Sequence, residues 1–276
     1  MNEQPTSAPY NPLFIDSLNH PLAGPIRQLL TRTGRQELQQ ILIDDEENIL
    51  QALEAGVEID SVYYAGDEVV SETLRKNLTA GATIHEVAKR TTKKLFENDK
   101  ISRIFAIAET PKSLGLEALK TITKDVVVLE DLSISGNIGN IIRTSLALGV
   151  GGIILLNMDP LDIYDRRLIR ASRGYVFSLP IITASTKQLI DYCTRNNQPL
   201  LVTSAAATRT VDEIASIPER LLIVFGSEKE GASPEIEQAS MLQVRIPINK
   251  KVESLNVSAA AGITLYNRVK FNQVNP

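Results

Sequence analysis

The sequence predicts an α/β protein of two domains, the second built on a parallel sheet with helices on both faces. The chain has 276 residues, which at roughly 150 residues per domain gives about two domains. Short β-branched runs alternate with helical patterns along most of its length. Apolar residues make up 43% and charged residues 22%, which allows two well-packed cores and excludes extensive disorder.

The first half of the chain predicts a small α/β domain over 22–110, preceded by a flexible arm over the polar residues 1–21. β-branched and aromatic runs indicate strands at 39–44, 61–65, 82–87 and 104–108. Helical spacing indicates helices at 45–55, 70–78 and 92–96, the first of which stops at Gly56.

The second half predicts a parallel sheet over 125–276, after a linker at 111–124. The run 125–129 is almost continuously apolar, as expected of a strand covered on both faces. Further strands are expected at 152–156, 199–203, 221–225 and 244–248, and helices at 137–148 and 257–270 with others between the strands. Strands that alternate with helices in this way form parallel sheets.

Residue counts exclude several kinds of site. The net charge is −4, so a nucleic-acid site must be a local basic patch on an acidic protein. Both histidines, His20 and His85, precede the second domain, which excludes a Ser/His/Asp triad and a histidine metal site there. The single Cys193 cannot form an internal disulfide or a thiolate metal cluster. Chemistry in the second domain must therefore use Arg, Glu, Asn, Ser and backbone groups, and no metal is expected.

The sequence shows no signal for secretion or membrane insertion. The N-terminus lacks a basic region followed by an apolar stretch. The longest apolar runs are far below the ~18 residues that a membrane span needs. A cytoplasmic protein without a membrane partner is therefore expected.

Three loops that follow predicted strands could carry chemistry, because ligands of parallel sheets collect beyond the carboxyl ends of the strands. The first, 135–144, opens a helix with two glycines, Gly136 and Gly139, which are expected to bring backbone close to a ligand. Its helical spacing places Asn140, Arg143 and Thr144 on one face. The second, 225–233, nearly spells a phosphate-binding loop, but Ala232 stands where the lysine is required, which disfavours an ATPase. The third is 246–258. Each loop, taken alone, could also be an ordinary capped helix start or strand-to-helix turn.

Together the three loops resemble the signature motifs of the SpoU/TrmH branch of the SPOUT methyltransferases. The matching residues are Asn137-x-Gly139-x-x-x-Arg143, then 222–231, then Ile246-Pro247 followed by 254–258. The segments 136–139, 143–149 and 165–180 closely resemble those of the thiostrepton- and nosiheptide-resistance ribosomal RNA methyltransferases. The resemblance covers residues 40–270 and is looser in the first domain.

The resemblance implies a fold, a reaction and a set of partners. The fold would be a C-terminal SPOUT domain with a trefoil knot, preceded by a small αβα ribosomal-protein-like domain that recognises folded RNA. The reaction would be methyl transfer from S-adenosylmethionine to a ribose 2′-hydroxyl of RNA, without a metal. Members of the family are homodimers with sites at the subunit interface.

The resemblance also assigns roles to residues of this chain. The catalytic positions would be Asn137, Arg143, Glu228, Ser254 and Asn256. The cofactor would be bound by Thr203, Ser204, Gly226, Ile246 and Leu255. Arg173 is expected to reach the site from the partner subunit and to contact RNA. A guanidinium is essentially always protonated, so we favour the hypothesis that Arg143 binds an RNA phosphate and stabilises the developing alkoxide instead of acting as a base.

The densest basic run of the first domain is a candidate RNA surface. It comprises Lys89, Arg90, Lys93 and Lys94, to which Arg27, Arg32 and Arg35 could add; the alternative is a solvated helix face. The leading hypothesis is 2′-O-methylation of an adenosine of 23S rRNA that confers thiopeptide resistance. The alternatives are the same reaction on tRNA or another rRNA nucleotide, and a non-catalytic RNA-binding protein.

Overall fold

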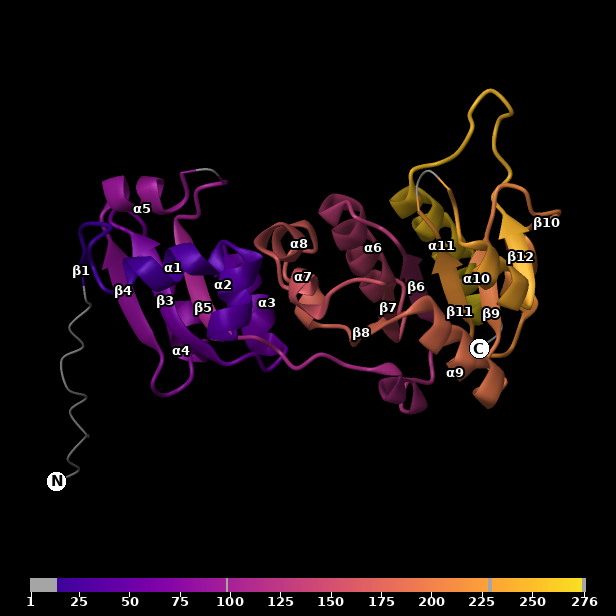
Figure 1. Ribbon diagram of the computed structural model, residues 1–276, viewed down its shortest axis with the longest axis horizontal. Helices are drawn as coiled ribbons and strands as arrows, with labels where there is room; N and C mark the ends of the chain where they lie inside the picture. Colours follow the sequence, from indigo (N-terminus) through magenta and orange to yellow (C-terminus); the bar gives the residue numbers. More distant parts are fainter. Residues whose placement is uncertain (1–13, 98, 228–229, 275–276) are drawn as a thin grey trace. The chain divides into compact units, whose positions relative to one another are not determined.

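The computed structural model describes residues 14–97, 99–227 and 230–274. The chain divides into two compact units, Met1–Thr110 and Pro111–Pro276. Each unit has a sheet with helices packed against it (Figure 1). Within the part of the chain that the structure describes, no helix is long and apolar enough to cross a membrane.

The first unit contains a five-stranded mixed sheet in the order β1-β4-β3-β5-β2. Its strands are β1 (Phe14–Ile15), β2 (Gln40–Asp44), β3 (Ile59–Ala65), β4 (Thr83–Val87) and β5 (Ile104–Glu109). Its helices are α1 (Ala23–Leu29), α2 (Arg32–Leu38), α3 (Glu46–Glu54), α4 (Glu72–Asn77) and α5 (Lys89–Leu95). β1, β4 and β3 pair in parallel, whereas β5 is antiparallel to both β3 and β2. The predicted alternation of strands and helices is therefore confirmed.

Aromatic rings form the centre of this unit. Tyr63 stacks on His85 and on Phe105, with ring centroids 5.1 and 5.0 Å apart. Phe105 meets Phe96 edge to face, and Ile26 of α1 joins the same core. Burial, together with the nearby His20, lowers the pKa of His85 below its usual value. This imidazole is therefore a packed core group.

The structure corrects the second half of the expected flexible arm. Residues 1–13 lie outside the described residues, but Phe14–Ile15 pairs with β4, and the Ile15 side chain is fully buried. The Thr91 hydroxyl also donates a hydrogen bond to the carbonyl of Asp16 at 2.5 Å. Because Ile15 fills the core beside α1, this segment belongs to the folded unit.

The second unit contains a seven-stranded sheet in the order β10-β12-β9-β11-β6-β7-β8, and every pairing in it is parallel. Its strands are β6 (Val126–Glu130), β7 (Gly152–Leu156), β8 (Ile181–Ala184), β9 (Leu200–Thr203), β10 (Arg209–Thr210), β11 (Leu222–Phe225) and β12 (Leu242–Arg245). The predicted parallel sheet is confirmed. Sequence reasoning missed β8 and β10. β10 has two residues, too few to show a period, whereas β8 is no shorter than the predicted β9 and β11.

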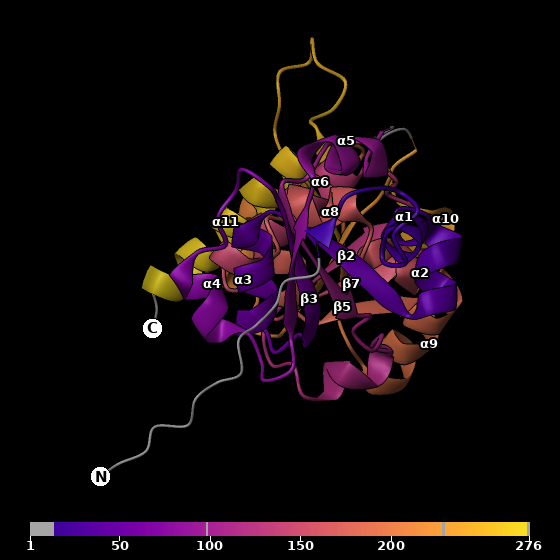
Figure 2. The same cartoon turned by 90° about the vertical axis from the view of Figure 1, so that its left-hand side faces the viewer.

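Helices cover both faces of this sheet (Figures 1 and 2). The helices are α6 (Ser135–Ala147), α7 (Pro160–Ile163), α8 (Arg166–Ala171), α9 (Thr186–Asn196), α10 (Pro234–Ala239) and α11 (Val257–Val274), with 3-10 turns at Leu116–Lys120, Tyr175–Phe177 and Val211–Ser216. α9 and α10 pack on one core, while α6 packs against both α8 and α11. Cys193 of α9 is buried there, and burial raises the pKa of its thiol to about 11, so it is a packing residue.

Residues 111–124, expected as a linker, pack onto the second unit. Leu119 in the 3-10 turn is 1% exposed and belongs to the core beneath α9. Leu114 forms a parallel bridge with Ile182 of β8. The segment is held by the buried Leu119 side chain and by the backbone bridge of Leu114 to β8, contacts that local sequence pattern does not reveal.

Candidate active site

The predicted loops lie at one edge of the second sheet, where they follow the carboxyl ends of four neighbouring strands. β12, β9, β11 and β6 are adjacent in the sheet order. The residues that follow them are 246–256, 204–208, 226–233 and 131–134. In parallel sheets this edge is where ligands bind. The segment between β12 and α11 projects beyond the strand ends in both views (Figures 1 and 2).

Two of the predicted catalytic residues touch each other. The side-chain amide of Asn256 donates to Oδ1 of Asn137 at 3.1 Å, which joins the start of α11 to the start of α6. Oδ1 of Asn256 accepts from the backbone N–H of Ser258 at 2.9 Å, so Asn256 also caps α11. These two residues are 119 positions apart, and the fold alone brings them together.

The turn that begins at Gly226 folds back tightly on itself. Ser227 and Gly231 exchange backbone hydrogen bonds of 2.9 and 3.0 Å, and Gly231 adopts φ +76°. A Cβ placed on Gly226 would lie 2.1 Å from the nitrogen of Ala232. Glycine is required here because the returning backbone occupies the space of a side chain. Glu228 of the predicted catalytic set lies outside the described residues.

The predicted cofactor residues lie around this edge. Thr203 is the last residue of β9, Ser204 follows that strand, and Ile246 follows β12; all three are half-buried. The Thr203 hydroxyl donates to the carbonyl of Val224 at 3.0 Å, and the backbone N–H of Ser204 donates to Val244. Leu255 is half-buried beside the exposed Ser254. The Thr203 hydroxyl therefore links β9 to β11.

Arg143 lies on the exposed face of α6, less than two turns beyond Asn137. It lines a cavity of about 640 Å³ with the predicted neighbours Asn140 and Thr144 and with residues of other segments, namely Tyr175, Ser258 and Ala259. The predicted face of α6 therefore faces the start of α11. Sequence reasoning did not assign Tyr175, although it lies in the segment with the subgroup resemblance.

Gly139 has a different role from the one its spacing suggested. A Cβ on Gly139 would lie 2.5 Å from Cβ of Ala171, so this glycine lets α6 and α8 cross closely. Nothing lies within 4 Å of a Cβ on Gly136. The expectation that both glycines bring backbone to a ligand is therefore wrong for Gly139, which serves helix packing.

Arg173 follows α8 in a left-handed conformation with φ +52°, and its side chain is exposed. A non-glycine residue with positive φ is uncommon and is concentrated at turns and functional sites. The conformation lets the next residue, Gly174, begin the 3-10 turn that carries Tyr175. Arg173 and Arg143 thus belong to segments that pack on each other, since that turn contacts α6.

The predicted basic surface lies on α5 of the first unit. Lys89, Arg90, Lys93 and Lys94 are all exposed, and Lys89 pairs with Asp67 at 2.6 Å. Arg35, expected to extend this surface, is only 2% exposed, because α2 turns it into the unit. Arg35 therefore cannot contribute to an RNA-facing patch.

Among the described residues, no group of three or more His, Cys, Asp or Glu side chains is placed to hold a metal ion. The turns at the sheet edge offer backbone amides and carbonyls together with the half-buried apolar side chains of Ile246 and Leu255. Such a set can bind the adenine and ribose of a nucleoside.

Comparisons with known proteins agree with this geometry. The SpoU rRNA methylase family matches residues 124–266, and the N-terminal part of thiostrepton-resistance methylases matches residues 12–122. The 23S rRNA (adenosine(1067)-2′-O)-methyltransferase of Streptomyces azureus is 36% identical over 94% of this chain and 97% of its own length. The enzyme of the same name from Streptomyces laurentii is 37% identical over 90% of this chain and 92% of its own length.

A solved structure shares the fold of almost the whole chain. The AdoMet-bound rRNA methyltransferase of Sinorhizobium meliloti superposes with a TM-score of 0.80 at 26% identity, covering 93% of this chain and 97% of that one. The resemblance found in the three motifs is thereby confirmed. The chain belongs to the SpoU rRNA methylase family and carries the N-terminal domain of the thiostrepton-resistance methylases.

Proposed function

We propose that this protein transfers the methyl group of S-adenosylmethionine to the ribose 2′-hydroxyl of an adenosine in 23S rRNA. The observation that carries the proposal is the contact between Asn137 and Asn256. It joins the first and third motifs at the sheet edge where the turn at Gly226 follows β11. The names of the two Streptomyces relatives supply the RNA and the nucleotide. The cytoplasm, where rRNA resides, is the proposed location.

S-adenosylmethionine carries its methyl group already activated on a sulfonium, so the protein needs only to bind and orient the reactants. Backbone groups of Gly226, Ile246 and Leu255 would hold its adenosine, with Thr203 and Ser204 at the rim of the same edge. Asn137 and Asn256 would fix the relative position of α6 and α11. Ser254 and Glu228 would complete the site on the two loops that adjoin it.

Arg143 would bind the RNA phosphate next to the target ribose. Its guanidinium offers several N–H donors in a rigid fork, which suits a phosphate and a developing alkoxide. Because a guanidinium stays protonated, the proton of the 2′-hydroxyl would leave to a phosphate, to water or to a neighbouring group. Arg173 would add a second contact to the RNA from the partner subunit.

The first unit would supply affinity for the folded RNA. Lys89, Arg90, Lys93 and Lys94 are exposed on one short helix of an otherwise acidic protein. Such cations contact phosphates and set the register, while RNA shape and the exposed nucleotide provide discrimination. Because these few cations provide the electrostatic attraction, RNA binding should weaken steeply with added salt.

Methylation mapping tests the proposed reaction. Bacterial 23S rRNA and tRNA are each incubated with the protein, with and without S-adenosylmethionine, and 2′-O-methylation is read as protection from alkaline cleavage. One new protected adenosine in 23S rRNA, dependent on the cofactor, is expected. Expression in a sensitive bacterium should then raise the tolerated thiostrepton concentration. Protection of tRNA instead, or of neither RNA, would contradict the proposal.

We also propose a homodimer through α6 and α11. Apolar side chains on these packed elements face outward: Ile134 before α6 is 50% exposed, and Ile263 and Tyr266 of α11 are 39% and 59% exposed. Residues three apart on a helix share a face, so Ile263 and Tyr266 form one apolar stripe.

A trefoil knot stays a prediction, supported by the strand order in which β11 lies between β9 and β6.

The mass in solution tests the dimer. Light scattering should give twice the chain mass of 30.3 kDa for the wild-type protein. Tyr266→Arg places a charge in the proposed interface and should yield monomers. Met241→Arg is the matched control, since Met241 is also 59% exposed but lies outside these helices. A monomeric wild-type protein, or dissociation by both variants alike, would rule out this interface.

A further inference from the structure

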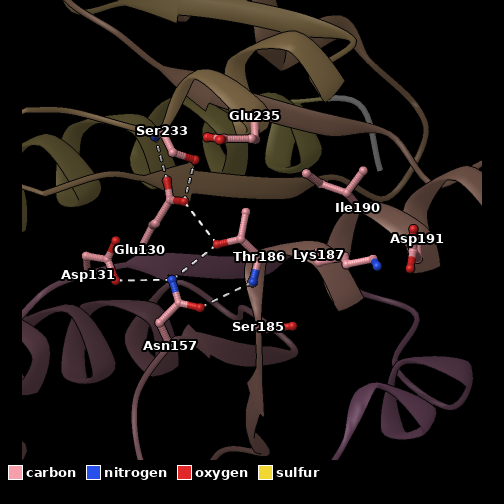
Figure 3. A pocket seen from close by; sticks show the side chains of 10 residues that line it. All are labelled: Glu130, Asp131, Asn157, Ser185, Thr186, Lys187, Ile190, Asp191, Ser233 and Glu235. Atoms are coloured by element: carbon pink, nitrogen blue, oxygen red, sulfur yellow. Dashed lines mark hydrogen bonds between the residues drawn. The ribbon is translucent and has the colours of Figure 1, made fainter.

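Glu130, the last residue of β6, is a carboxylate almost completely removed from solvent. It is 2% exposed, and it borders a cavity of about 600 Å³ at the carboxyl end of β6 (Figure 3). Burying a charge without compensation costs several kcal/mol, so a buried carboxylate persists only where hydrogen bonds satisfy it. The hydrogen-bond partners of Glu130 therefore indicate the role of this buried carboxylate.

Three hydrogen bonds satisfy this carboxylate, and two of them come from Ser233. Oε2 accepts from the backbone N–H of Ser233 at 2.9 Å, and Oε1 accepts from its hydroxyl at 2.7 Å. The third comes from the hydroxyl of Thr186 at the start of α9, at 3.3 Å. Figure 3 shows the two Ser233 bonds reaching Glu130 from one side and Thr186 from the other.

Ser233 is where the turn that begins at Gly226 ends. It caps α10 by accepting a hydrogen bond from the N–H of Ile236, and Ala232 immediately before it packs against Gly226. The other end of the turn is anchored in β11, which pairs with β6, the strand that carries Glu130. One buried carboxylate thus clamps the free end of the turn to the neighbouring strand, 103 positions away in sequence.

The Thr186 side of the network is itself anchored. The Asn157 amide donates to Asp131 Oδ1 and to the Thr186 hydroxyl, both at 3.2 Å. Asp131 and Asn157 both have positive φ, 53° and 58°, a conformation that costs energy unless the surroundings impose it. The network therefore holds Glu130 rigidly on the side away from the turn.

We propose that Glu130 is a positioning residue for methyl transfer: through Ser233 it holds residues 231–233, which pack against Gly226, in the conformation that receives S-adenosylmethionine. Glu130 itself contacts neither S-adenosylmethionine nor the RNA. The inference rests on the proposed function, since it assigns the turn to cofactor binding. The Ser233 bonds are the part of the network that matters for the cofactor, and the Thr186 bond is not.

The test measures S-adenosylmethionine affinity by calorimetry and thermal stability for Glu130→Gln, Ser233→Ala, their double variant and Thr186→Val. Glutamine keeps the shape but offers only one acceptor oxygen. Glu130→Gln and Ser233→Ala should each weaken cofactor binding about tenfold, the effect of one hydrogen bond to a charged group. The double variant should be no weaker than the worse single variant, because both substitutions act on the same pair of residues, Glu130 and Ser233.

Thr186→Val is the matched control, because it removes a hydrogen bond to the same carboxylate without touching the turn. It should lower the melting temperature while cofactor affinity stays within twofold. If Glu130→Gln fails to fold, Ser233→Ala carries the test, since it leaves the carboxylate in place. Unchanged affinity in Ser233→Ala, or an equal loss in Thr186→Val, would overturn the inference. A wild-type protein that binds no S-adenosylmethionine would instead overturn the proposed function.

Discussion

Replacing Gly226 with alanine is expected to abolish S-adenosylmethionine binding. The new Cβ would lie 2.1 Å from the nitrogen of Ala232 and 2.2 Å from the carbonyl oxygen of Gly231. Both are backbone atoms, so no side-chain rotation relieves the overlap, and the turn must open. We expect at least a hundredfold weaker binding and a loss of about 3 kcal/mol in the free energy of unfolding, the upper end of overpacking costs. Calorimetry with S-adenosylmethionine and denaturant unfolding measure the two effects.

Gly136→Ala provides the control for this change. Gly136 lies in the first turn of α6, beside Asn137, and nothing stands within 4 Å of its Cβ position. Alanine there should leave cofactor affinity within twofold and stabilise the helix slightly. Normal cofactor binding by Gly226→Ala would mean that the turn is not part of the cofactor site.

Arg143→Lys is expected to lower the single-turnover rate of methylation about 100- to 1000-fold, the range seen when a donor to a developing oxyanion is lost. Lysine keeps the charge but replaces the planar fork with one ammonium group. Cofactor affinity should not change, because Arg143 lines the cavity over α6 and α11 and is absent from the turn at Gly226. The rate is measured with radiolabelled S-adenosylmethionine and an rRNA fragment between pH 6 and 9.

The pH profile separates the two roles considered for Arg143. If it binds phosphate and alkoxide, the rate falls uniformly and the profile keeps its shape, since neither side chain titrates in this range. A changed profile would favour a base role. Arg195→Lys is the control, as Arg195 lies on α9, where its Nε donates to the carbonyl of Asp191. Retained activity with an unchanged profile in Arg143→Lys would show that neither the fork nor a base is needed.

Local pattern was sufficient where a residue's role depends on its neighbours in the chain. The run 125–129 is apolar after Asp125, and its apolar residues lie in the fully buried strand β6 (Val126–Glu130). The spacing of Asn140, Arg143 and Thr144 places them on one helix face that lines a cavity. Local pattern misled where a role depends on a distant segment. Gly139 serves the crossing of α6 with α8 at Ala171, and Arg35 is buried although it is charged and lies in a polar segment.

Glu130 shows the same limit at the site itself. Glu130 and Asp131 follow an apolar run in the sequence, and nothing in that pattern distinguishes Glu130 from a surface charge. The role of Glu130 depends on Ser233. The pairing of β6 with β11 brings the Ser233 hydroxyl oxygen to 2.7 Å from Oε1 of Glu130. The contact between Asn137 and Asn256 has the same origin, since α6 and α11 pack although their sequences lie far apart.

The sequence by itself determined the two-part α/β architecture, the parallel sheet, the three motif loops and, through them, the family. These follow from periodicity and short-range spacing, which reside in consecutive residues. Only the tertiary structure decided which loops meet, which glycines accommodate neighbouring backbone and which carboxylate holds the turn in place. Such contacts depend on strand order and helix crossing, and these are set by how the whole apolar core packs, a property that no local window of residues contains.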